Sequence, residues 1–367
     1  MRIVIAGGGT AGHVFPALAL ARRLASAGHE VRFVGTAHGQ EARLVPAAGF
    51  PLVEVEARPL VRRPSLRAVV APIAALRSVG RLRPVVRTSD VVVGMGGYVS
   101  VPAALAALRE RRPLVLHEQN AVPGLANRIL ARGARSIGVA FADAARALPR
   151  RASVIVTGNP VRDEILAVGA ERERLAKEAI EELELDEARA TVVVFGGSQG
   201  ALHLNRSTVE AVRGMTSAEI QVVLLTGAAH AGSVRAALGP EPPVPVRVLA
   251  FLERMELAYA AADLVVARAG ATTVAEVAAC GVASVLIPYP YATGRHQEAN
   301  ARALQRAGGA SVLLDDELDG PALAERIREL LDDPDRLRSM GERARAWSRP
   351  DAADALAALV LDAGAAA

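Results

Sequence analysis

Two short apolar runs of the chain each end in a glycine-rich turn and continue into a helical pattern. The first is residues 3–6, followed by Gly7-Gly8-Gly9-Thr10-Ala11-Gly12. The second is residues 192–195, followed by Gly196-Gly197-Ser198-Gln199-Gly200. A strand that turns directly into a helix on glycines is the opening of a parallel α/β unit. Because this opening occurs once in each half, the sequence predicts two domains of the same class.

Around both turns, short β-branched runs alternate with longer amphipathic stretches, a pattern typical of doubly wound parallel sheets. We expect strands at 3–6, 31–35, 91–93, 114–116, 136–139, 154–156, 192–195, 222–225, 246–249, 264–266 and 284–287, and helices that include 15–27, 201–213, 273–279 and 296–307. The predicted fold class is α/β: two Rossmann-like domains, residues 1–163 and 164–347, facing across a cleft. Ligands of such sheets bind beyond the carboxyl ends of the strands, so the cleft is the expected active site.

Composition sets further bounds on the chain. With 367 residues, 51% of them hydrophobic, two full cores can be built. The single cysteine, Cys280, excludes an internal disulfide and a cysteine-based metal cluster and favours a reducing compartment. The N-terminus lacks a signal-peptide layout and no apolar run approaches 18 residues, so we expect a cytoplasmic protein.

The first glycine turn fits the dinucleotide fingerprint G-x-G-x-x-G, which also requires an acidic residue about 20 residues later to hold the ribose. The second predicted strand ends in Gly35-Thr36 with no carboxylate at its tip, which argues against nicotinamide binding. Phosphate-loop, zinc-protease and serine-hydrolase motifs are absent from the sequence. The one Asp-x-Asp, at Asp333-Pro334-Asp335, is interpreted as a helix cap, and we predict no catalytic metal and no cofactor.

A set of motifs in fixed order spans nearly the whole chain. They are Gly8-Gly9-Thr10-Ala11-Gly12-His13-Val14-Phe15-Pro16-Ala17, Gly94-Met95-Gly96-Gly97-Tyr98, His117-Glu118-Gln119-Asn120, Gly158-Asn159-Pro160-Val161-Arg162, Gly196-Gly197-Ser198-Gln199-Gly200-Ala201, Arg268-Ala269-Gly270-Ala271-Thr272-Thr273-Val274-Ala275-Glu276 and Gln297-Glu298-Ala299-Asn300-Ala301. Together they resemble the MurG type of bacterial glycosyltransferase, which has the GT-B fold.

The resemblance implies a reaction and its partners. N-acetylglucosamine would pass from UDP-N-acetylglucosamine to the C4 hydroxyl of undecaprenyl-diphospho-N-acetylmuramoyl-pentapeptide (lipid I), with inversion at the anomeric carbon. The product is lipid II, used in peptidoglycan synthesis. The enzyme would act at the cytoplasmic face of the bacterial inner membrane, with other cell-wall enzymes as candidate partners. The family pattern also implies that the last helix, about 348–367, packs back on the first domain.

The resemblance also assigns donor contacts. Thr272 and Thr273, at a helix start, would cradle the diphosphate, Glu276 would accept the ribose hydroxyls, and the loop around Leu252 would read uracil. The full set of donor residues is Thr10, Ala11, Gly12, Asn120, Arg162, Ser198, Leu252, Ala271, Thr272, Thr273, Val274, Glu276, Gln297 and Asn300. Two departures from the family pattern are Ala11, where a second glycine is usual, and His296, where a glutamine is common.

Inverting transfer needs a base for the acceptor hydroxyl and stabilisation of the departing UDP. His13, at the start of the first helix, is the main candidate base, because a helix N-terminus favours the neutral imidazole. The alternative is that His13 only hydrogen-bonds the acceptor. Glu118 is the next catalytic candidate, and His117 follows it. Gly96, Gly97, Tyr98 and His117 are the expected acceptor contacts.

Between Glu56 and Asp90 the chain has eight arginines and no acidic residue. Apolar residues lie between them at helical spacing, a pattern that favours an anionic lipid surface. We expect a peripheral membrane patch that includes Arg77, Arg81 and Arg83. A solvated helix is the alternative, because arginine is abundant throughout and Lys177 is the only lysine. Nucleic acid is not expected as a partner, since aromatic residues make up only 3% of the chain.

Three other functions remain open from the sequence: a GT-B transferase with another lipid or natural-product acceptor, a nucleotide-binding oxidoreductase, and a sensor that binds the nucleotide sugar without turnover.

Overall fold

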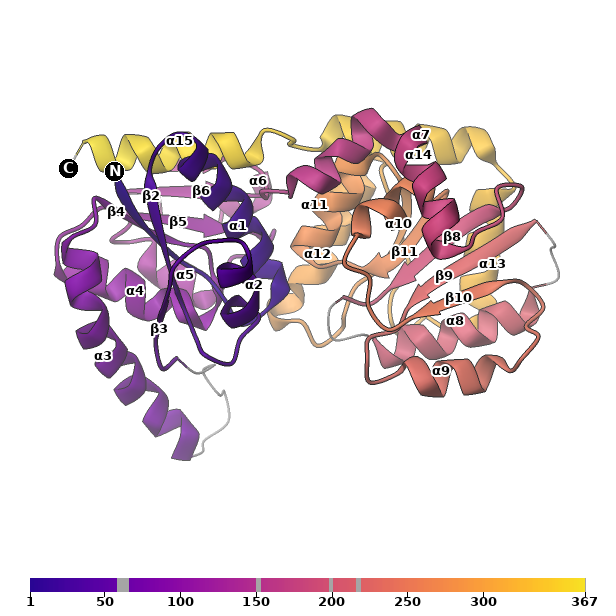
Figure 1. The fold of residues 1–367 in the computed structure, drawn as a ribbon, viewed down its shortest axis with the longest axis horizontal. Coiled ribbons are helices and arrows are strands. Elements are labelled where there is room, and N and C mark those ends of the chain that lie inside the picture. Colours follow the sequence, from indigo (N-terminus) through magenta and orange to yellow (C-terminus); the bar gives the residue numbers. More distant parts are fainter. Residues whose placement is uncertain (58–65, 150–152, 198–200, 216–218, 367) are drawn as a thin grey trace. The chain divides into compact units, whose positions relative to one another are not determined.

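A computed structural model describes residues 1–57, 66–149, 153–197, 201–215 and 219–366, with residues 66–76 as helical backbone only. The chain divides into two compact units (Figure 1). Unit 1 is residues 1–162 together with 349–367, and unit 2 is residues 163–348. Among the described residues, none of the helices combines the length and the apolar character needed to cross a bilayer.

Unit 1 is built on a parallel sheet of seven strands in the order β3-β2-β1-β4-β5-β6-β7. The strands are β1 (Arg2–Ala6), β2 (Glu30–Gly35), β3 (Leu52–Glu54), β4 (Val91–Gly94), β5 (Leu114–Glu118), β6 (Ser136–Val139) and β7 (Ser153–Val156). The helices are α1 (Ala11–Ser26), α2 (Glu41–Ala47), α3 (Leu66–Arg87), α4 (Gly97–Arg109), α5 (Leu125–Leu130), α6 (Ala142–Ala145) and α15 (Ala352–Ala365).

Both faces of this sheet are buried, as alternation along β1 illustrates. Val4 and Ala6 belong to a core with α3 and α4, whereas Ile3 and Ile5 belong to a second core with α1 and α15. Successive residues of a strand point to opposite faces, so a continuous apolar run indicates a sheet covered on both sides. Helix α15, the last element of the chain, contributes Leu356 to the second core and so belongs to unit 1.

Unit 2 contains a parallel sheet of six strands in the order β10-β9-β8-β11-β12-β13. The strands are β8 (Ala190–Phe195), β9 (Ile220–Leu225), β10 (Val246–Leu249), β11 (Leu264–Arg268), β12 (Ala283–Ile287) and β13 (Ser311–Val312). The helices are α7 (Asp163–Leu183), α8 (Leu202–Gly214), α9 (Ala231–Leu238), α10 (Met255–Ala261), α11 (Ala271–Cys280), η1 (Thr293–Arg295), α12 (His296–Arg306), α13 (Gly320–Leu331) and α14 (Pro334–Trp347).

The predicted fold class is confirmed: both units are parallel, doubly wound α/β sheets. Two strands escaped the sequence prediction, β3 and β13. Both are edge strands, of three and two residues, too short to show the alternation on which the prediction relies. The Asp333 cap is confirmed, because its carboxylate accepts the N–H of Arg336 at the start of α14, 2.9 Å away.

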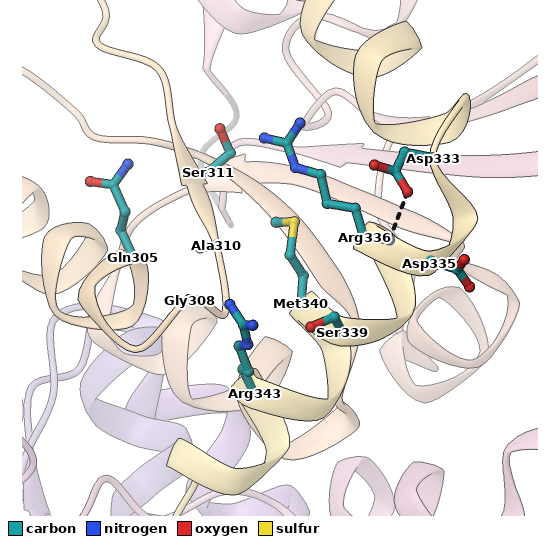
Figure 2. A pocket seen from close by; sticks show the side chains of 10 residues that line it. All are labelled: Gln305, Gly308, Ala310, Ser311, Asp333, Asp335, Arg336, Ser339, Met340 and Arg343. Carbon is teal, nitrogen blue, oxygen red and sulfur yellow. Dashed lines mark hydrogen bonds between the residues drawn. The ribbon is translucent and has the colours of Figure 1, made fainter.

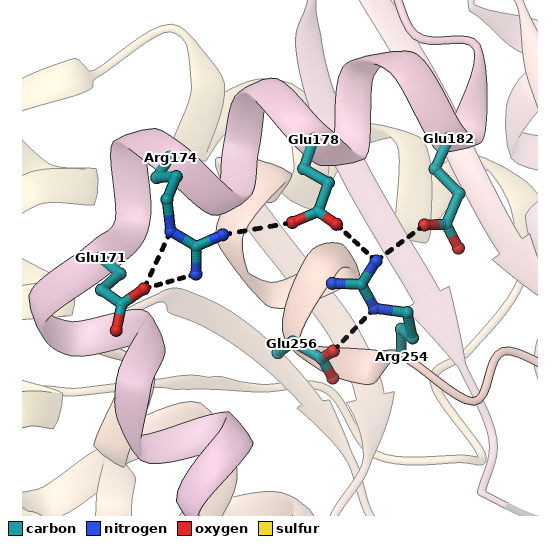
Figure 3. Close-up of polar contacts among 6 residues, drawn as sticks. All are labelled: Glu171, Arg174, Glu178, Glu182, Arg254 and Glu256. Carbon is teal, nitrogen blue, oxygen red and sulfur yellow. Dashed lines mark hydrogen bonds and ion pairs between the residues drawn. The ribbon is translucent and has the colours of Figure 1, made fainter.

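A network of ion pairs joins α7 to α10 in unit 2 (Figure 3). The Nη1 atom of Arg254 lies 2.6 Å from Glu178 and 3.0 Å from Glu182, and its Nε atom lies 3.1 Å from Glu256. Because carboxylates surround this guanidinium, the pKa of Arg254 is raised further above its already high value, with Glu178 as the first cause. The network fixes the second half of α7, which continues beyond non-helical dihedral angles at Glu171.

In each sheet the strand order reverses beside the strand that opens the unit. In unit 1 this switch point lies between β1 and β4, and in unit 2 between β8 and β11. Loops that leave the carboxyl ends of two such strands diverge to opposite faces and leave room for a ligand. The fold therefore places the loops after β1 and β4 together, and likewise those after β8 and β11.

Candidate active site

The loops after β1 and β4 touch at the switch point of unit 1. Gly9 has φ +88°, a conformation that favours glycine, and a Cβ atom there would lie 2.8 Å from Cε1 of Tyr98. A Cβ atom on Gly97 would lie 2.8 Å from the carbonyl oxygen of Gly8. The predicted residues of the two motifs thus form one surface, on which glycine is required for close approach.

His13 lies in the first turn of α1, against the loop after β4. Its Nδ1 atom lies 3.0 Å from the hydroxyl of Thr10, and a Cβ atom on Gly96 would lie 3.3 Å from its Nε2 atom. If Nδ1–H donates to Thr10, Nε2 carries the lone pair that can accept a proton. Glycine at position 96 therefore allows the imidazole ring to pack closely against the loop after β4.

The carboxylate of Glu41, which was not predicted as a site residue from the sequence, contacts the first glycine turn. Glu41, the first residue of α2, has no exposed surface. Its Oε2 accepts the N–H of Gly9 at 2.8 Å, and its Oε1 accepts the N–H and hydroxyl of Thr36 at 2.9 and 2.7 Å. Burial raises the pKa of this carboxyl, but the hydrogen bonds from Thr36 and Gly9 together outweigh it and lower the pKa below its ordinary value.

Glu118, at the end of β5, organises the loop that follows it. One carboxylate oxygen accepts the backbone N–H of Asn120 at 2.9 Å, and the other accepts from Gly124 N at 3.0 Å and Asn127 Nδ2 at 2.9 Å. The side chain is buried. Both carboxylate oxygens are engaged by donors of the following loop, so the arrangement favours a structural role for Glu118 over proton transfer.

His117 is buried with 1% of its surface exposed, and its Nε2 atom lies 3.1 Å from the carbonyl oxygen of Gly158. Burial lowers its pKa to about 4; the hydrogen bond to Gly158 opposes that shift and the charge of His13 adds to it. The ring is therefore neutral at neutral pH. This burial makes His117 a poor candidate for either proton transfer or direct acceptor contact.

In unit 2, helix α11 starts directly after β11 at the switch point. Its first residues are Ala271, Thr272 and Thr273, and no side chain caps it from Gly270. The N-terminus of a helix attracts anions through its N–H groups and its dipole. Val274 is buried in the first turns and anchors this helix end.

Glu276 is buried later in α11, and its Oε2 accepts the hydroxyl of Tyr259, 2.9 Å away. Tyr259 is fully buried on α10 and was not selected from the sequence. Asn300, also fully buried, donates from Nδ2 to the carbonyl oxygen of Ala269 at 3.2 Å, and Gln297 accepts the N–H of Tyr289 at 3.0 Å. These contacts fix the turn before α11 and the start of α12.

A buried ion pair lies at the carboxyl end of β11. Nη1 of Arg268, at the end of β11, lies 2.5 Å from Asp315 and donates to the carbonyl oxygens of Ile287 and Pro288 at 3.3 Å each. His203 of α8 lies 3.2 Å from the other oxygen of Asp315. No periodic or motif signal marks Asp315 in the sequence, because its partners come from other elements.

The remaining predicted residues are distributed over both units. Arg162 lies over the ring of Phe15, 4.3 Å from its centroid, at the end of unit 1. Ala11 is the first residue of α1, where φ is negative, so its methyl group is tolerated. Gly12 follows it in the helix, and Leu252 is buried in the loop before α10. Ser198 lies outside the described residues.

The α3 arginines differ in their surroundings. Arg77 is exposed, whereas Arg81 lies 3.3 Å from Glu56 and Arg83 lies 2.5 Å from Glu110. Carboxylates from outside the acid-free stretch therefore neutralise part of the predicted patch. Residues 58–65 and the side chains of residues 66–76 lie outside the description.

A hollow of about 560 Å³ in unit 2 lies between the end of α12, β13 and α14 (Figure 2). Arg336 and Arg343 line it together with Asp333 and Asp335. None of the predicted site residues is among those that line it. Because it lacks these residues and its lining carries both charges, we do not include it in the candidate site.

The chain matches two family models. Residues 3–139 match the N-terminal domain of glycosyltransferase family 28, and residues 191–356 match the C-terminal domain of that family. Together these matches cover most of both units.

Curated relatives and a solved structure agree with these models. Proteins from Halothermothrix orenii (40% identical; 99% of each chain covered) and Acidithiobacillus ferrooxidans (42% identical; 98% of this chain and 97% of the relative covered) are both named UDP-N-acetylglucosamine–N-acetylmuramyl-(pentapeptide) pyrophosphoryl-undecaprenol N-acetylglucosamine transferase. The crystal structure of Acinetobacter baumannii MurG matches with a TM-score of 0.76 at 30% identity, covering 98% of this chain and 99% of that one.

Proposed function

The chain belongs to the MurG-type glycosyltransferases of family 28, and on that premise we propose that it transfers N-acetylglucosamine from UDP-N-acetylglucosamine to lipid I, giving lipid II. The observation that carries this proposal is similarity over essentially the whole length of both chains to relatives of that name. The oxidoreductase alternative lacks support, because Glu41 already accepts the Gly9 N–H at the first glycine turn.

His13 is the proposed base. With Nδ1 in contact with Thr10, Nε2 would take the proton of the acceptor hydroxyl as that oxygen attacks the anomeric carbon. Glu118 and His117 are then given supporting roles: Glu118 holds the loop that carries Asn120, and neutral His117 braces Gly158. Gly96, Gly97 and Tyr98 remain the proposed acceptor surface.

The donor is assigned to unit 2. The start of α11 directs its N–H groups toward the diphosphate, and it stabilises the charge that develops on departing UDP. Glu276, oriented by Tyr259, is the proposed ribose contact, and Gln297 the proposed sugar contact. Asn300 acts through the Ala269 carbonyl instead. Thr10, Ala11, Gly12, Arg162, Ser198 and Leu252 remain proposed donor contacts.

We further propose that the protein works at a membrane surface that contains anionic lipid. Unit 1 exposes apolar side chains on α5, where Leu125 is 64% and Ile129 is 55% exposed. Arg128 and Arg132 are exposed beside them, and no acidic residue occurs between Glu118 and Asp143. Exposed apolar groups interleaved with cations suit an anionic bilayer surface.

The experiment that tests the reaction is release of UDP by the purified protein with UDP-N-acetylglucosamine in EDTA, with and without a short-chain lipid I analogue. We expect release that depends on the acceptor and survives the chelator, and almost none with the C4 epimer of the donor. His13→Gln should retain donor binding and lose turnover. Donor binding without acceptor-dependent release in the wild type would overturn the assigned acceptor.

A further inference from the structure

At the first glycine turn, a backbone N–H donates to a carboxylate of the protein itself, that of Glu41. In dinucleotide-binding sheets, the N–H groups of this turn receive a phosphate of the ligand. Here the carboxylate of Glu41 accepts a hydrogen bond from the Gly9 N–H. It also accepts hydrogen bonds from the N–H and the hydroxyl of Thr36, at the end of β2. One buried side chain thus joins the loops after β1 and β2.

The packing around Glu41 shows that the backbone is shaped to this carboxylate. A Cβ atom on Gly8, Gly35 or Gly39 would lie 2.4, 2.5 or 2.1 Å from an atom of the Glu41 side chain. Side chains at these positions would displace it. Gly8 of the loop after β1, Gly35 at the end of β2 and Gly39 of the loop after β2 therefore enclose one carboxylate that has no exposed surface.

The turn that Glu41 holds leads directly to the proposed base. Gly9 precedes Thr10, whose hydroxyl lies 3.0 Å from Nδ1 of His13. Tyr98 lies against Gly9 from the other side. The position of Gly9 therefore determines both the orientation of His13 and the contact between the two loops.

We propose that Glu41 is a positioning residue for the transfer reaction: its carboxylate replaces a ligand phosphate at the first glycine turn and holds Gly9, and through it Thr10 and His13, in the reactive arrangement. This inference rests on the proposed function. Because Glu41 is fully buried, it does not contact substrate. Its loss should reduce kcat and leave the KM for UDP-N-acetylglucosamine nearly unchanged.

Glu41→Gln is the sharpest variant. An amide keeps the size of the side chain but can accept on one side only, so either Gly9 or Thr36 faces an N–H₂ group and loses its acceptor. Thr36→Val removes one of the three donors and should have a smaller effect. Glu54→Gln is the matched control, because Glu54 is exposed on β3 in the same unit.

The experiment measures kcat and both KM values per folded protein, well below the melting temperature, together with hydrogen exchange of the peptide that contains residues 7–13. For Glu41→Gln we expect a fall in kcat of about tenfold or more, a donor KM within about threefold of wild type, and faster exchange in this peptide. In Glu41→Ala, added formate should restore part of kcat by occupying the vacated anion position. Glu54→Gln should match wild type.

Two results would overturn the inference: an unchanged kcat in Glu41→Gln beside an active wild type, or a loss explained entirely by the unfolded fraction with no formate rescue. An inactive wild type would instead overturn the proposed function. The exchange measurement needs no substrate, so it would still decide whether Glu41 holds the turn; unchanged exchange in Glu41→Gln would show that it does not.

Discussion

Three buried carboxylates, Glu41, Glu118 and Glu276, lie at the loops that form the candidate site. Each accepts hydrogen bonds from protein donors: backbone and hydroxyl groups at Glu41, backbone and amide groups at Glu118, and a tyrosine hydroxyl at Glu276. A buried charge is stable only where such donors replace water. At the residue scale, Glu41 and Glu118 hold the loops beside them, and Glu276 joins α11 to α10.

Glu276 gives the first prediction at this scale. Glu276→Gln should raise the KM for UDP-N-acetylglucosamine about tenfold, because a charge-assisted hydrogen bond to the ribose is weakened by about 1.5 kcal/mol. Tyr259→Phe removes only the hydroxyl that orients Glu276, so it should raise the KM for UDP-N-acetylglucosamine less than Glu276→Gln does. Steady-state kinetics with both substrates varied will show this, with the acceptor KM as internal control. A selective rise in the acceptor KM would contradict the ribose assignment.

His117 gives a prediction about pH. The unfolded side chain binds a proton near pH 6.5, whereas the folded one does so only near pH 4. The unfolded state therefore binds more protons between these values, and the stability of unit 1 decreases as pH falls through that window, by about 2 kcal/mol at pH 5. Below pH 4 both states are protonated and this loss is complete.

Replacing the histidine should remove that dependence. The melting temperature of His117→Gln should decline less than that of wild type between pH 7.5 and pH 5, as measured by calorimetry. This range lies above the window in which Glu41, with its lowered pKa, is protonated. His38→Gln, on an exposed loop, controls for loss of a histidine. Parallel pH curves for wild type and His117→Gln would refute the prediction.

Sequence patterns identified the residues whose role is local and missed those whose role depends on distant partners. Gly9 and Thr272 were found because a strand, a glycine turn and a helix follow one another along the chain. Glu41 was missed because the dinucleotide fingerprint directs attention to a carboxylate at the tip of β2, whereas Glu41 reaches the turn from α2. Tyr259 and Asp315 likewise act on residues of other elements.

At the element scale, the same distinction separates central from edge strands. The central strands β1 and β8 are apolar runs buried on both faces, and the sequence predicted them nearly to the residue. The edge strands β3 and β13 depend on a neighbour for their existence. Helix α7 is a third case, because its attachment to α10 depends on Arg254, from a different part of the chain.

Arg254 gives a prediction about this attachment. Arg254→Gln removes the cation that joins Glu178, Glu182 and Glu256, although Arg174 stays 3.4 Å from Glu178. Unit 2 should therefore be less stable at low salt, with a melting temperature lower by about 2–4 °C. In 1 M NaCl the difference should shrink, because these groups are partly exposed and screened. Arg206→Gln, on the exposed surface of α8, is the control; equal melting temperatures at low salt would contradict the prediction.

At the scale of the whole molecule, each unit has its own switch point, and the proposed function assigns the acceptor to the one in unit 1 and the donor to the one in unit 2. Unit 1 presents an imidazole beside glycine-rich backbone, and unit 2 presents a helix N-terminus beside a buried carboxylate. The motif order along the chain predicted a glycine turn and a helix start at the switch point of each unit, and both are present. The surface that would meet a lipid was less predictable, because the partners of Arg81 and Arg83 lie outside the stretch that drew attention to them.

That surface gives the last prediction. Two sets of variants separate the contributions of α3 and α5: Arg77, Arg81 and Arg83 each changed to Glu, and Leu125 and Ile129 each changed to Gln. Because Arg81 and Arg83 already lie beside carboxylates, we expect the α5 pair to release the protein from anionic vesicles at least as fully as the α3 triple change. Co-sedimentation with vesicles of anionic and of neutral lipid measures this, and turnover of a soluble acceptor analogue should be unaffected in both.

If the α5 pair binds vesicles like wild type and only the α3 variant is released, the membrane surface lies on α3. If both variants stay bound, neither helix forms it.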